Sequence, residues 1–517
     1  MRFSCSIVAC ILAASFPAAA ETIDLKAAAD FVVYGERPQE LAGSSIAHGD
    51  FDGDGVDDVA IGALGGRPSV EAGVSTGAVS IFFGGAEIGA SLSAGLSGAP
   101  CRIVGVRAQQ AIGQTLATGD FDGDGLTDLL IGSPWTVEGD STLSGGGAAY
   151  VVLGRARDAF PKILSLPDSA DVVFTSPGKE VHLGDDVALG DFDGDGLDDV
   201  AIGAMYSNGR RDESPHAGVA YLYLGRARKK IEPRVDLGKK SDLAMHGSDR
   251  DDTAGRSLVY SDWNGDGKMD LLVGAYYGDG PDNARIDPGE AHVVLGRPKA
   301  KLGDGALELG VGGSSIPIYG EWVRGALARG TTAGDLDGDG FGDVVVTAYR
   351  APETGDRSLC GIVDVLFGAK ETPPSIDLAS ECEFRIIGGA TWDNIGRYVA
   401  TGDLNRDGKA ELFIEIPFGD PANADGSLRF QAGLLGIVMG RPKSEYPDTL
   451  DLATAPFDHV VEGIDPNDQM PMAVDVLDID GDAKSDLVIG APMTAARGND
   501  SPFAGEIYFL LGKSRSW

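Results

Sequence analysis

The sequence has few residues suited to thiol chemistry. Its 517 residues include five cysteines, and Cys5 and Cys10 fall in an N-terminal apolar segment, which leaves Cys101, Cys360 and Cys382. We expect Cys360 and Cys382 to begin neighbouring antiparallel strands, so that they lie at opposite ends and too far apart for a disulfide. We therefore predict no structural disulfide, although an exported protein could form one.

Motifs for catalysis are also missing. The six histidines form no His-Glu-x-x-His pair, and the chain has no Gly-x-Ser-x-Gly turn. These histidines are His48, His182, His216, His246, His292 and His459. We expect His48 and His182 to lie near acidic loops, as surface or packing residues. We predict that the protein is not an enzyme, although 79 acidic residues could hide a carboxylate pair for glycoside cleavage.

Positive charge, aromatic residues and long apolar runs are scarce. Lys and Arg number 42 against 79 Asp and Glu, a net charge of −37, and aromatic residues make up 7% of the chain. This balance argues against nucleic acid and anionic membranes as partners. After the first 20 residues no segment reaches the ~20 apolar residues of a membrane span. No long stretch shows apolar residues at helical spacing, which favours short strands.

The N-terminus predicts export. Arg2, an apolar run and the small residues Ala18–Ala20 are typical of a secretory signal peptide cut after Ala20. The alternative, a lipoprotein box ending at Cys10, leaves only nine residues before that cysteine. We therefore predict a signal peptide over 1–20. The mature protein, 21–517, is expected to be a soluble monomer outside the cell or in a periplasm.

Glycine and aspartate, by contrast, are abundant and form a repeated pattern. The nine-residue pattern Asp-x-Asp-x-Asp-Gly-x-x-Asp occurs seven times, with small lapses. The copies begin at Asp50, Asp120, Asp191, Asp262, Asp335, Asp403 and Asp478, at intervals of 70, 71, 71, 73, 68 and 75 residues. Such regular spacing indicates an array of one structural unit.

Each unit has the pattern of four short strands. In the second copy, residues 112–119 lead into the acidic loop, and apolar segments follow at 129–134, 147–154 and 171–175. Four strands repeated seven times predict an all-β, seven-bladed β-propeller over 21–517. The chain ends after a third strand, at 505–512, and opens with segments that elsewhere accompany a fourth strand, at 23–25 and 31–35. We therefore expect the N-terminal strand to complete the last blade and close the ring.

The acidic loops have the chemistry of a calcium site. Four oxygen side chains at alternate positions, bent by glycine, form a cage for a hard cation. Carboxylates packed within ~4 Å repel by several kcal/mol per pair, so such a loop needs a cation. Oxygen ligands favour Ca²⁺ over Zn²⁺, and Mg²⁺ gives up its water reluctantly. Helix–loop–helix calcium proteins are excluded because position twelve is Ile61, Ile131 or Ile202 rather than an acid.

Seven loops in register with Ile-Gly-Ala-like strands resemble the FG-GAP repeats of the integrin alpha-subunit propeller. The resemblance implies that each loop joins the first two strands of a blade and binds structural Ca²⁺, five to seven ions in all. The implied ligands, including one carbonyl per loop, are Asp50, Asp52, Asp54, Val56 and Asp58; Asp120, Asp122, Asp124, Leu126 and Asp128; Asp191, Asp193, Asp195, Leu197 and Asp199; Asp262, Asn264, Asp266, Lys268 and Asp270; Asp335, Asp337, Asp339, Phe341 and Asp343; Asp403, Asn405, Asp407, Lys409 and Glu411; and Asp478, Asp480, Asp482, Lys484 and Asp486. Loop six has Asn405 and Glu411, and loop seven has Ala483 in place of Gly, so we predict that these two bind most weakly.

The resemblance also implies a partner-binding face opposite the calcium loops. The loops expected there carry Trp135, Tyr206, Tyr276, Tyr277, Trp322, Arg324, Tyr349, Arg350, Trp392, Phe418 and Phe503. Aromatic residues with Arg suit a contact surface, although several of them could instead cap the central channel. The chain has no Arg-Gly-Asp and no integrin leg segments, so pairing with an integrin beta partner is not implied.

We therefore predict a secreted calcium-binding propeller that acts as a protein-interaction or adhesion module, with an extracellular protein or glycan as partner. Two alternatives stay open. A lectin-like propeller would bind carbohydrate, but it should repeat a second aromatic motif between blades, which the five Trp residues do not do. A secreted propeller hydrolase or lyase would gather its catalytic groups on one face.

Overall fold

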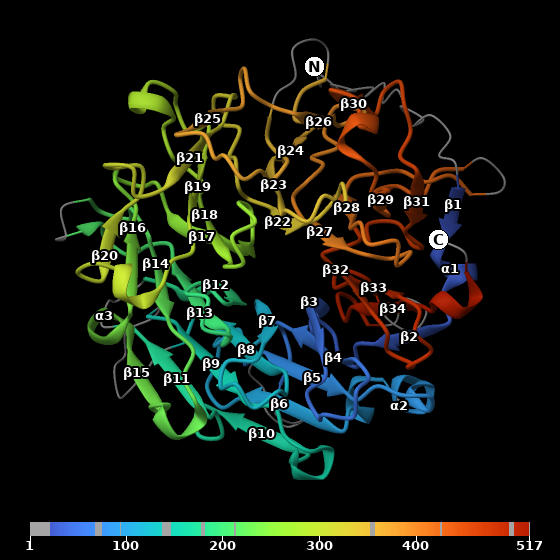
Figure 1. Ribbon diagram of the computed structural model, residues 1–517. Helices are drawn as coiled ribbons and strands as arrows, with labels where there is room; N and C mark the ends of the chain where they lie inside the picture. The colour runs from blue at the N-terminus through green and yellow to red at the C-terminus, as the bar shows by residue number, and fades with distance from the viewer. Residues whose placement is uncertain are drawn as a thin grey trace, which may run out of the picture.

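Seven β-sheets stand around a central axis (Figure 1). The structure is a computed structural model that describes residues 21–67, 75–93, 95–136, 146–176, 181–210, 214–351, 357–423, 427–495 and 501–515. The predicted signal peptide lies outside these residues. Within them, no helix has both the length and the apolar character needed to cross a membrane. The predicted all-β, seven-bladed propeller is confirmed.

In each blade the strands are hydrogen-bonded in order from the first strand outward. Blade 1 contains β3 (Ala42–Gly49), β4 (Asp58–Ala63), β5 (Ala78–Phe82), β6 (Cys101–Gly105) and β10 (Ile163–Leu166). Blade 2 contains β7 (Leu116–Gly119), β8 (Asp128–Ser133), β9 (Ala148–Val152), β11 (Val172–Thr175) and β15 (Arg234–Asp236). Blade 3 contains β12 (Leu183–Gly190), β13 (Asp199–Ala204), β14 (Val219–Tyr223), β16 (Leu243–His246) and β20 (Ala306–Glu308). Blade 4 contains β17 (Ala254–Ser261), β18 (Asp270–Ala275), β19 (Glu290–Val294), β21 (Ile316–Tyr319) and β25 (Ile376–Asp377).

The remaining blades follow the same order. Blade 5 contains β22 (Thr331–Gly334), β23 (Asp343–Ala348), β24 (Ile362–Leu366), β26 (Phe384–Ile387) and β30 (Thr449–Asp451). Blade 6 contains β27 (Val399–Gly402), β28 (Glu411–Ile416), β29 (Leu434–Val438), β31 (His459–Glu462) and β1 (Glu21–Asp24). Blade 7 contains β32 (Ala473–Leu477), β33 (Asp486–Ala491), β34 (Glu506–Leu510) and β2 (Phe31–Tyr34). In the described residues three short α-helices lie between strands: α1 (Leu25–Ala28), α2 (Ile88–Ser93) and α3 (Leu237–Lys240).

Six blades have a fifth strand that the sequence pattern did not predict. The first four strands of a blade pair antiparallel, and a short strand from the following repeat then runs parallel to the fourth, as β10 does beside β6. It is formed by the apolar segment that precedes each fourth strand. This addition covers the outer edge of the blade, which would otherwise present unpaired backbone groups.

The N-terminal residues close the ring, as predicted. β2 pairs antiparallel with β34 of blade 7, and β1 pairs parallel with β31 of blade 6. Blade 7 has four strands, and α2 of the next repeat packs against β2, where Gly89 leaves room for the Phe31 ring.

The hydrophobic core is divided into seven clusters, one between each pair of neighbouring blades. The cluster of blades 2 and 3, for example, joins Leu130 and Val151 to Val200 and Ile202. Leu25 in α1 is fully buried in the cluster that joins blades 6 and 7. The ring therefore depends on every interface between blades, including the one that the N-terminal segment seals.

The closing segment supplies a test of this arrangement. We expect Leu25→Ala to lower the unfolding free energy by about 2–5 kcal/mol, because a buried leucine is lost from the core. Lys26→Ala, at the exposed neighbouring position, should change it little and serves as the control. Denaturant unfolding measures both; equal midpoints for the two variants would contradict the sealing role of the segment.

Candidate functional site

The seven acidic loops lie on one rim of the ring, each between the first and second strands of its blade. In blade 1 the loop runs from Asp50, directly after β3, to Asp58, the first residue of β4. We call this edge the cage rim. The loops after the second and fourth strands lie at the other ends of the strands, and we call that side the opposite face.

Backbone groups hold the carboxylates of each loop in place. Asp50 accepts hydrogen bonds from the N–H groups of Gly53 (2.7 Å), Asp54 (3.0 Å) and Gly55 (2.9 Å). Asp52 Oδ1 accepts from Asp54 N at 3.1 Å, and Asp54 Oδ1 accepts from Val56 N at 3.0 Å. Backbone donors of the loop itself thus fix the position of each side chain.

The ninth acid has the most buried position. Asp58 is fully buried, and its two oxygens accept from Phe51 N (2.9 Å) and Gly84 N (2.8 Å). Asp128 repeats this pattern with Phe121 and Gly154. Gly84 follows the third strand, so this one carboxylate joins the loop to the second and third strands of its blade.

The loops fit a hard cation. One oxygen from each of the acids at positions one, three and nine lies within 4.8 Å of the others in blades 1, 2, 3 and 7, and the acids at positions one, three and five meet this limit in blade 5. Buried carboxylate oxygens of Asp122, Asp193 and Asp480 have no hydrogen-bond partner among the described residues. Burial, together with the charges of Asp52 and Asp54, raises the pKa of Asp58 to about 7. Orphaned, mutually repelling oxygens of this kind are the ligand set that a divalent ion satisfies.

The loops are also joined from blade to blade. Phe51, the second loop residue, is buried in the core shared by blades 1 and 2, and its carbonyl accepts from Arg155 N of blade 2 at 2.9 Å. The Asp50 carbonyl accepts from Thr127 N, in the next acidic loop, at 3.0 Å. Arg157 of blade 2 forms ion pairs with Asp52 and, at 2.7 Å, with Asp54. The position of each loop is therefore coupled to the contact between two blades.

Loops four, six and seven depart from this scheme. Asn264 and Asn405 replace the acid at position three, and Lys268 and Lys409 form ion pairs with Asp266 and Asp407, both at 2.9 Å. Ala483 of loop seven has φ = 64°, and the glycine at the same position of loop one, Gly55, has φ = 85°. The left-handed turn expected at this position is thus present, and a side chain there is strained. The predicted ranking of affinities stays a prediction.

The predicted partner residues on the opposite face form two groups. Trp135 and Tyr206 lie on either side of the His182 ring, at centroid distances of 4.1 and 4.8 Å. A second group surrounds a cavity at blades 4–6, and it consists of Arg324, Tyr349, Arg350, Trp392 and Phe418. Tyr276 and Tyr277 lie beside this group, with the hydroxyls of Tyr276 and Tyr349 2.8 Å apart. Trp322 packs against the core of blades 4 and 5, and Phe503 belongs to neither group.

The two histidines expected near the acidic loops differ. His48 lies two residues before Asp50, where Asp475 of β32, 2.9 Å away, raises the pKa of the imidazole to about 9. For His182 the expectation is wrong. It precedes β12 (Leu183–Gly190), whereas the acidic loop follows that strand, so the full length of the strand separates them. His182 instead packs between aromatic rings on the opposite face.

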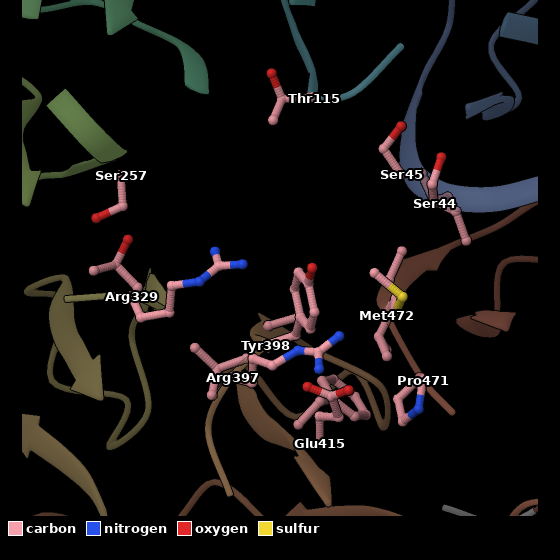
Figure 2. A pocket seen from close by; sticks show the side chains of 18 of the residues that line it. Ser44, Ser45, Thr115, Ser257, Arg329, Arg397, Tyr398, Glu415, Pro471 and Met472 are labelled. Carbon is pink, nitrogen blue, oxygen red and sulfur yellow. The ribbon is translucent and has the colours of Figure 1, made fainter. Parts of the chain in front are cut away.

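Sequence reasoning missed an axial cavity lined by the first strands. The cavity has a volume of about 270 Å³, and in the described part of the chain none of the predicted partner residues lines it. Figure 2 shows Arg329 and Arg397 extending into it, with Tyr398 and Glu415 close by. Their guanidinium carbons lie 5.6 and 5.3 Å from the Tyr398 ring centroid.

The repeats hold a signal for these residues. The sixth residue before the first acid of each loop is Ser44, Gln114, Asp185, Arg256, Arg329, Arg397 and Met472 in turn. Three consecutive blades therefore carry Arg at one axial position. Glu415, at the fifth position of β28, replaces a residue that is Gly in five other blades and Thr347 in blade 5. Glu415 is 1% exposed, and neither carboxylate oxygen has a hydrogen-bond partner in the described residues.

Fold and site together define a seven-bladed β-propeller with an acidic loop at the inner hairpin of every blade, and five of these loops bring three acids close enough to hold a cation. Comparison with known families identifies the repeat. The FG-GAP repeat model matches residues 42–82, 112–152, 183–223, 328–359 and 470–510. The chain therefore carries FG-GAP repeats. The segments without a match are those of blades 4 and 6, whose loops have Asn at position three.

The similar proteins are much longer. Integrin alpha-PS2 of Drosophila melanogaster is 31% identical over 254 residues, 48% of this chain and 16% of that protein. Phosphatidylinositol-glycan-specific phospholipase D of Dictyostelium discoideum is 28% identical over 193 residues, 35% of this chain and 20% of that protein. Among solved structures, rhamnogalacturonan lyase YesW aligns over 92% of this chain and 75% of its own, with a TM-score of 0.40 and 13% identity. At this score the likeness between the two structures is weak.

We expect Glu415 to make the stability of the protein depend on pH. Burial raises the pKa of its carboxyl to about 8, although Arg397 and Arg329 act to lower it. Between about pH 5 and 8 the folded state keeps a proton that the unfolded state loses, so stability falls as pH rises through this window. Glu415→Gln should remove this loss, and its stability advantage over the wild type should grow by up to about 1 kcal/mol per pH unit.

Unfolding at pH 5, 6, 7 and 8 in saturating Ca²⁺ checks this expectation. The exposed Glu445→Gln is the control, and it should follow the wild type at every pH. A constant difference between Glu415→Gln and wild type would show that the carboxyl does not titrate in this range.

Proposed function

We propose that this protein is an exported, calcium-stabilised propeller that binds a partner through its opposite face. The proposal rests on one observation: the cage rim and the opposite face carry different kinds of side chain. The acidic loops occupy the cage rim, whereas the aromatic and arginine side chains gather on the other side, where no repeat requires them. FG-GAP repeats and the similarity to integrin alpha subunits support an interaction or adhesion role.

Calcium is the cation that the loops favour. Their ligands are all oxygen atoms, and six of the loops also include a glycine at position six, as calcium loops of similar spacing do. The ion would be held by acids such as Asp50, Asp52, Asp54 and Asp58. It would cancel their mutual repulsion and so stabilise the junction between two blades. Its role is structural, because the described aromatic–arginine group lies at the other ends of the strands.

The opposite face supports contact with a partner of moderate size. Trp135 is 47% exposed and Tyr206 36% exposed, and both rings contact the His182 ring, one tilted and one edge-on. Exposed aromatic residues of this kind are enriched in the centres of interfaces. The signal peptide expected over residues 1–20 supports a partner outside the cytoplasm, which would be an extracellular or periplasmic protein or glycan.

A secreted enzyme is the second candidate. The specific observation in its favour is Glu415, a buried carboxyl beside Arg397, Arg329 and Tyr398 in the axial cavity. The similarity to a phospholipase D covers 20% of that protein and favours no particular reaction for this chain. The binding role is preferred because it requires no reaction to be assumed.

Removal of calcium should destabilise the whole ring. We expect EDTA to lower the melting temperature by many degrees, because the ions bind the folded state alone and each loop is bonded to the next blade. Millimolar Mg²⁺ should restore little of it, and Ca²⁺ should restore all of it. An unchanged melting temperature in EDTA would overturn the structural role of calcium.

Two matched variants connect this effect to the loops. Gly55→Ala puts a side chain at a left-handed position and should weaken calcium binding at loop one, whereas Ala483→Gly should strengthen it at loop seven by about 1 kcal/mol. Calorimetric titration measures both. If the seven loops titrate as equivalent sites, the predicted weakness of loops six and seven is wrong.

Capture from the native extracellular medium tests the binding face. The calcium-loaded wild type should capture a partner that the double variant Trp135→Ala, Tyr206→Ala does not capture. Val311→Ala, at an exposed position, should capture it as the wild type does. Equal capture by all three proteins would place the contact elsewhere.

A further inference from the structure

We propose that the opposite face of blades 4–6 binds a sugar carboxylate, with Arg324, Arg350 and Arg397 around the acid group and Trp392 against the sugar ring. The inference rests on the proposed function, because it names the ligand class for part of the binding face. It concerns the arginine–aromatic pocket and not the row around Trp135.

The pocket is a positively charged hollow in a strongly acidic protein. It has a volume of about 610 Å³ and is lined by Val323, Arg324, Tyr349, Arg350, Leu359, Trp392, Asn394, Arg397 and Phe418. Among the described residues its lining contains three arginines and no acid, although acids outnumber bases by 79 to 42 in the whole chain. This local reversal of charge selects an anionic ligand.

Comparison of the repeats shows that Trp392 is not required by the fold. Among the described residues, six blades enter their first strand through a turn with an equivalent left-handed residue. These residues are Gln39, Gln109, Asp251, Arg324, Trp392 and Asn467, with φ between 58° and 72°. Equivalent hydrogen bonds hold the backbone of these turns, since Gln109 N donates to Ser75 O at 2.7 Å and Trp392 N donates to Ser358 O at 2.9 Å. Of these six turns, only that of the sixth blade carries a bulky aromatic side chain, which left-handed backbone disfavours. Trp392 is 60% exposed and therefore contributes little to the core.

The arginines are placed to hold a carboxylate. Arg350 lies over the Tyr349 ring at 5.3 Å, and among the described residues neither Arg324 nor Arg350 forms an ion pair. Arg397 reaches the pocket from the axial cavity, and its buried Nε has no hydrogen-bond partner among the described atoms. Guanidinium groups in such settings form bidentate hydrogen bonds with carboxylates.

The walls of the pocket are fixed before binding. With its amide nitrogen facing two carbonyls, Asn394 donates to Leu359 O (3.1 Å) and Tyr349 O (3.2 Å) and so joins two of the loops. The Tyr349 hydroxyl bonds to that of Tyr276 at 2.8 Å. A preformed pocket loses little entropy when it binds a ligand.

Size and shape favour an acidic saccharide over an acidic peptide. The volume suits a compact ligand, whereas a stable protein interface covers about 800 Å² on each partner. A sugar acid carries a carboxylate on a ring with an apolar face, which matches a guanidinium group beside an exposed indole. An Asp or Glu side chain offers the carboxylate without the ring.

The test is calorimetric titration of the calcium-loaded protein with oligogalacturonate, with neutral galacto-oligosaccharide of equal length and with an acidic peptide. We expect saturable binding of oligogalacturonate that weakens with salt, and little binding of the other two. Trp392→Ala and Arg350→Ala should each weaken binding roughly tenfold or more. Gln109→Ala, in the equivalent turn of blade 2, should bind as the wild type does.

Three results would overturn the proposal. They are no binding of oligogalacturonate up to millimolar concentration, equal binding of the neutral sugar, or tighter binding of the peptide. Melting in Ca²⁺ and EDTA, measured on each variant, separates this failure from that of the proposed function. A variant that melts normally but does not bind supports the pocket. A wild type that melts as expected but does not bind oligogalacturonate would overturn the ligand class and leave the calcium-stabilised interaction module intact.

Discussion

The buried carboxylate at position nine of each acidic loop is the contact on which the propeller depends. Asp58 accepts one hydrogen bond from the loop and one from the residue after the third strand, and Asp128, Asp199, Asp343 and Asp486 repeat both bonds in blades 2, 3, 5 and 7. A buried charge is tolerated only when it is fully bonded or paired. In these blades both oxygens already accept hydrogen bonds from the backbone, so the negative charge itself remains to be balanced, as a cation held in the loop would do.

The same loops connect neighbouring blades. The second loop residue is apolar and buried between two blades, as Phe51, Phe121 and Phe192 are, and the carbonyl of the first loop residue accepts a hydrogen bond from the next loop. Order in one loop therefore supports the interface with the next. In a closed ring no blade can separate without the loss of two such interfaces, so ions held in the loops would act on the stability of the whole molecule.

The repeat makes departures from it informative. Most positions serve packing or the loops and recur in every blade, whereas blades 4–6 differ at several positions on the axis and the opposite face. Arg256, Arg329 and Arg397 occupy equivalent axial positions in three blades, and Glu415 stands where five other blades pack glycine against their neighbour. In blade 1, Gly62 has no room for a side chain because Ser45 and Gly113 lie against it. In blade 7 the residue equivalent to Gly113 is Pro471. The contact that leaves no room for a side chain at Gly62 is therefore altered where Glu415 of blade 6 faces blade 7.

The sequence alone determined the class of fold, the number of blades, the position of the acidic loops and the closure by the N-terminal strand. These features depend on local periodicity and on spacing within one repeat, both of which are visible along the chain. Tertiary structure decided the rest. The fifth strand pairs with a fourth strand of the previous repeat, His182 lies a whole strand away from the loop that follows it, and Arg324, Arg350 and Trp392 meet only because three blades lie side by side. Contacts between repeats depend on the curvature and packing of the ring, and no spacing within a single repeat encodes them.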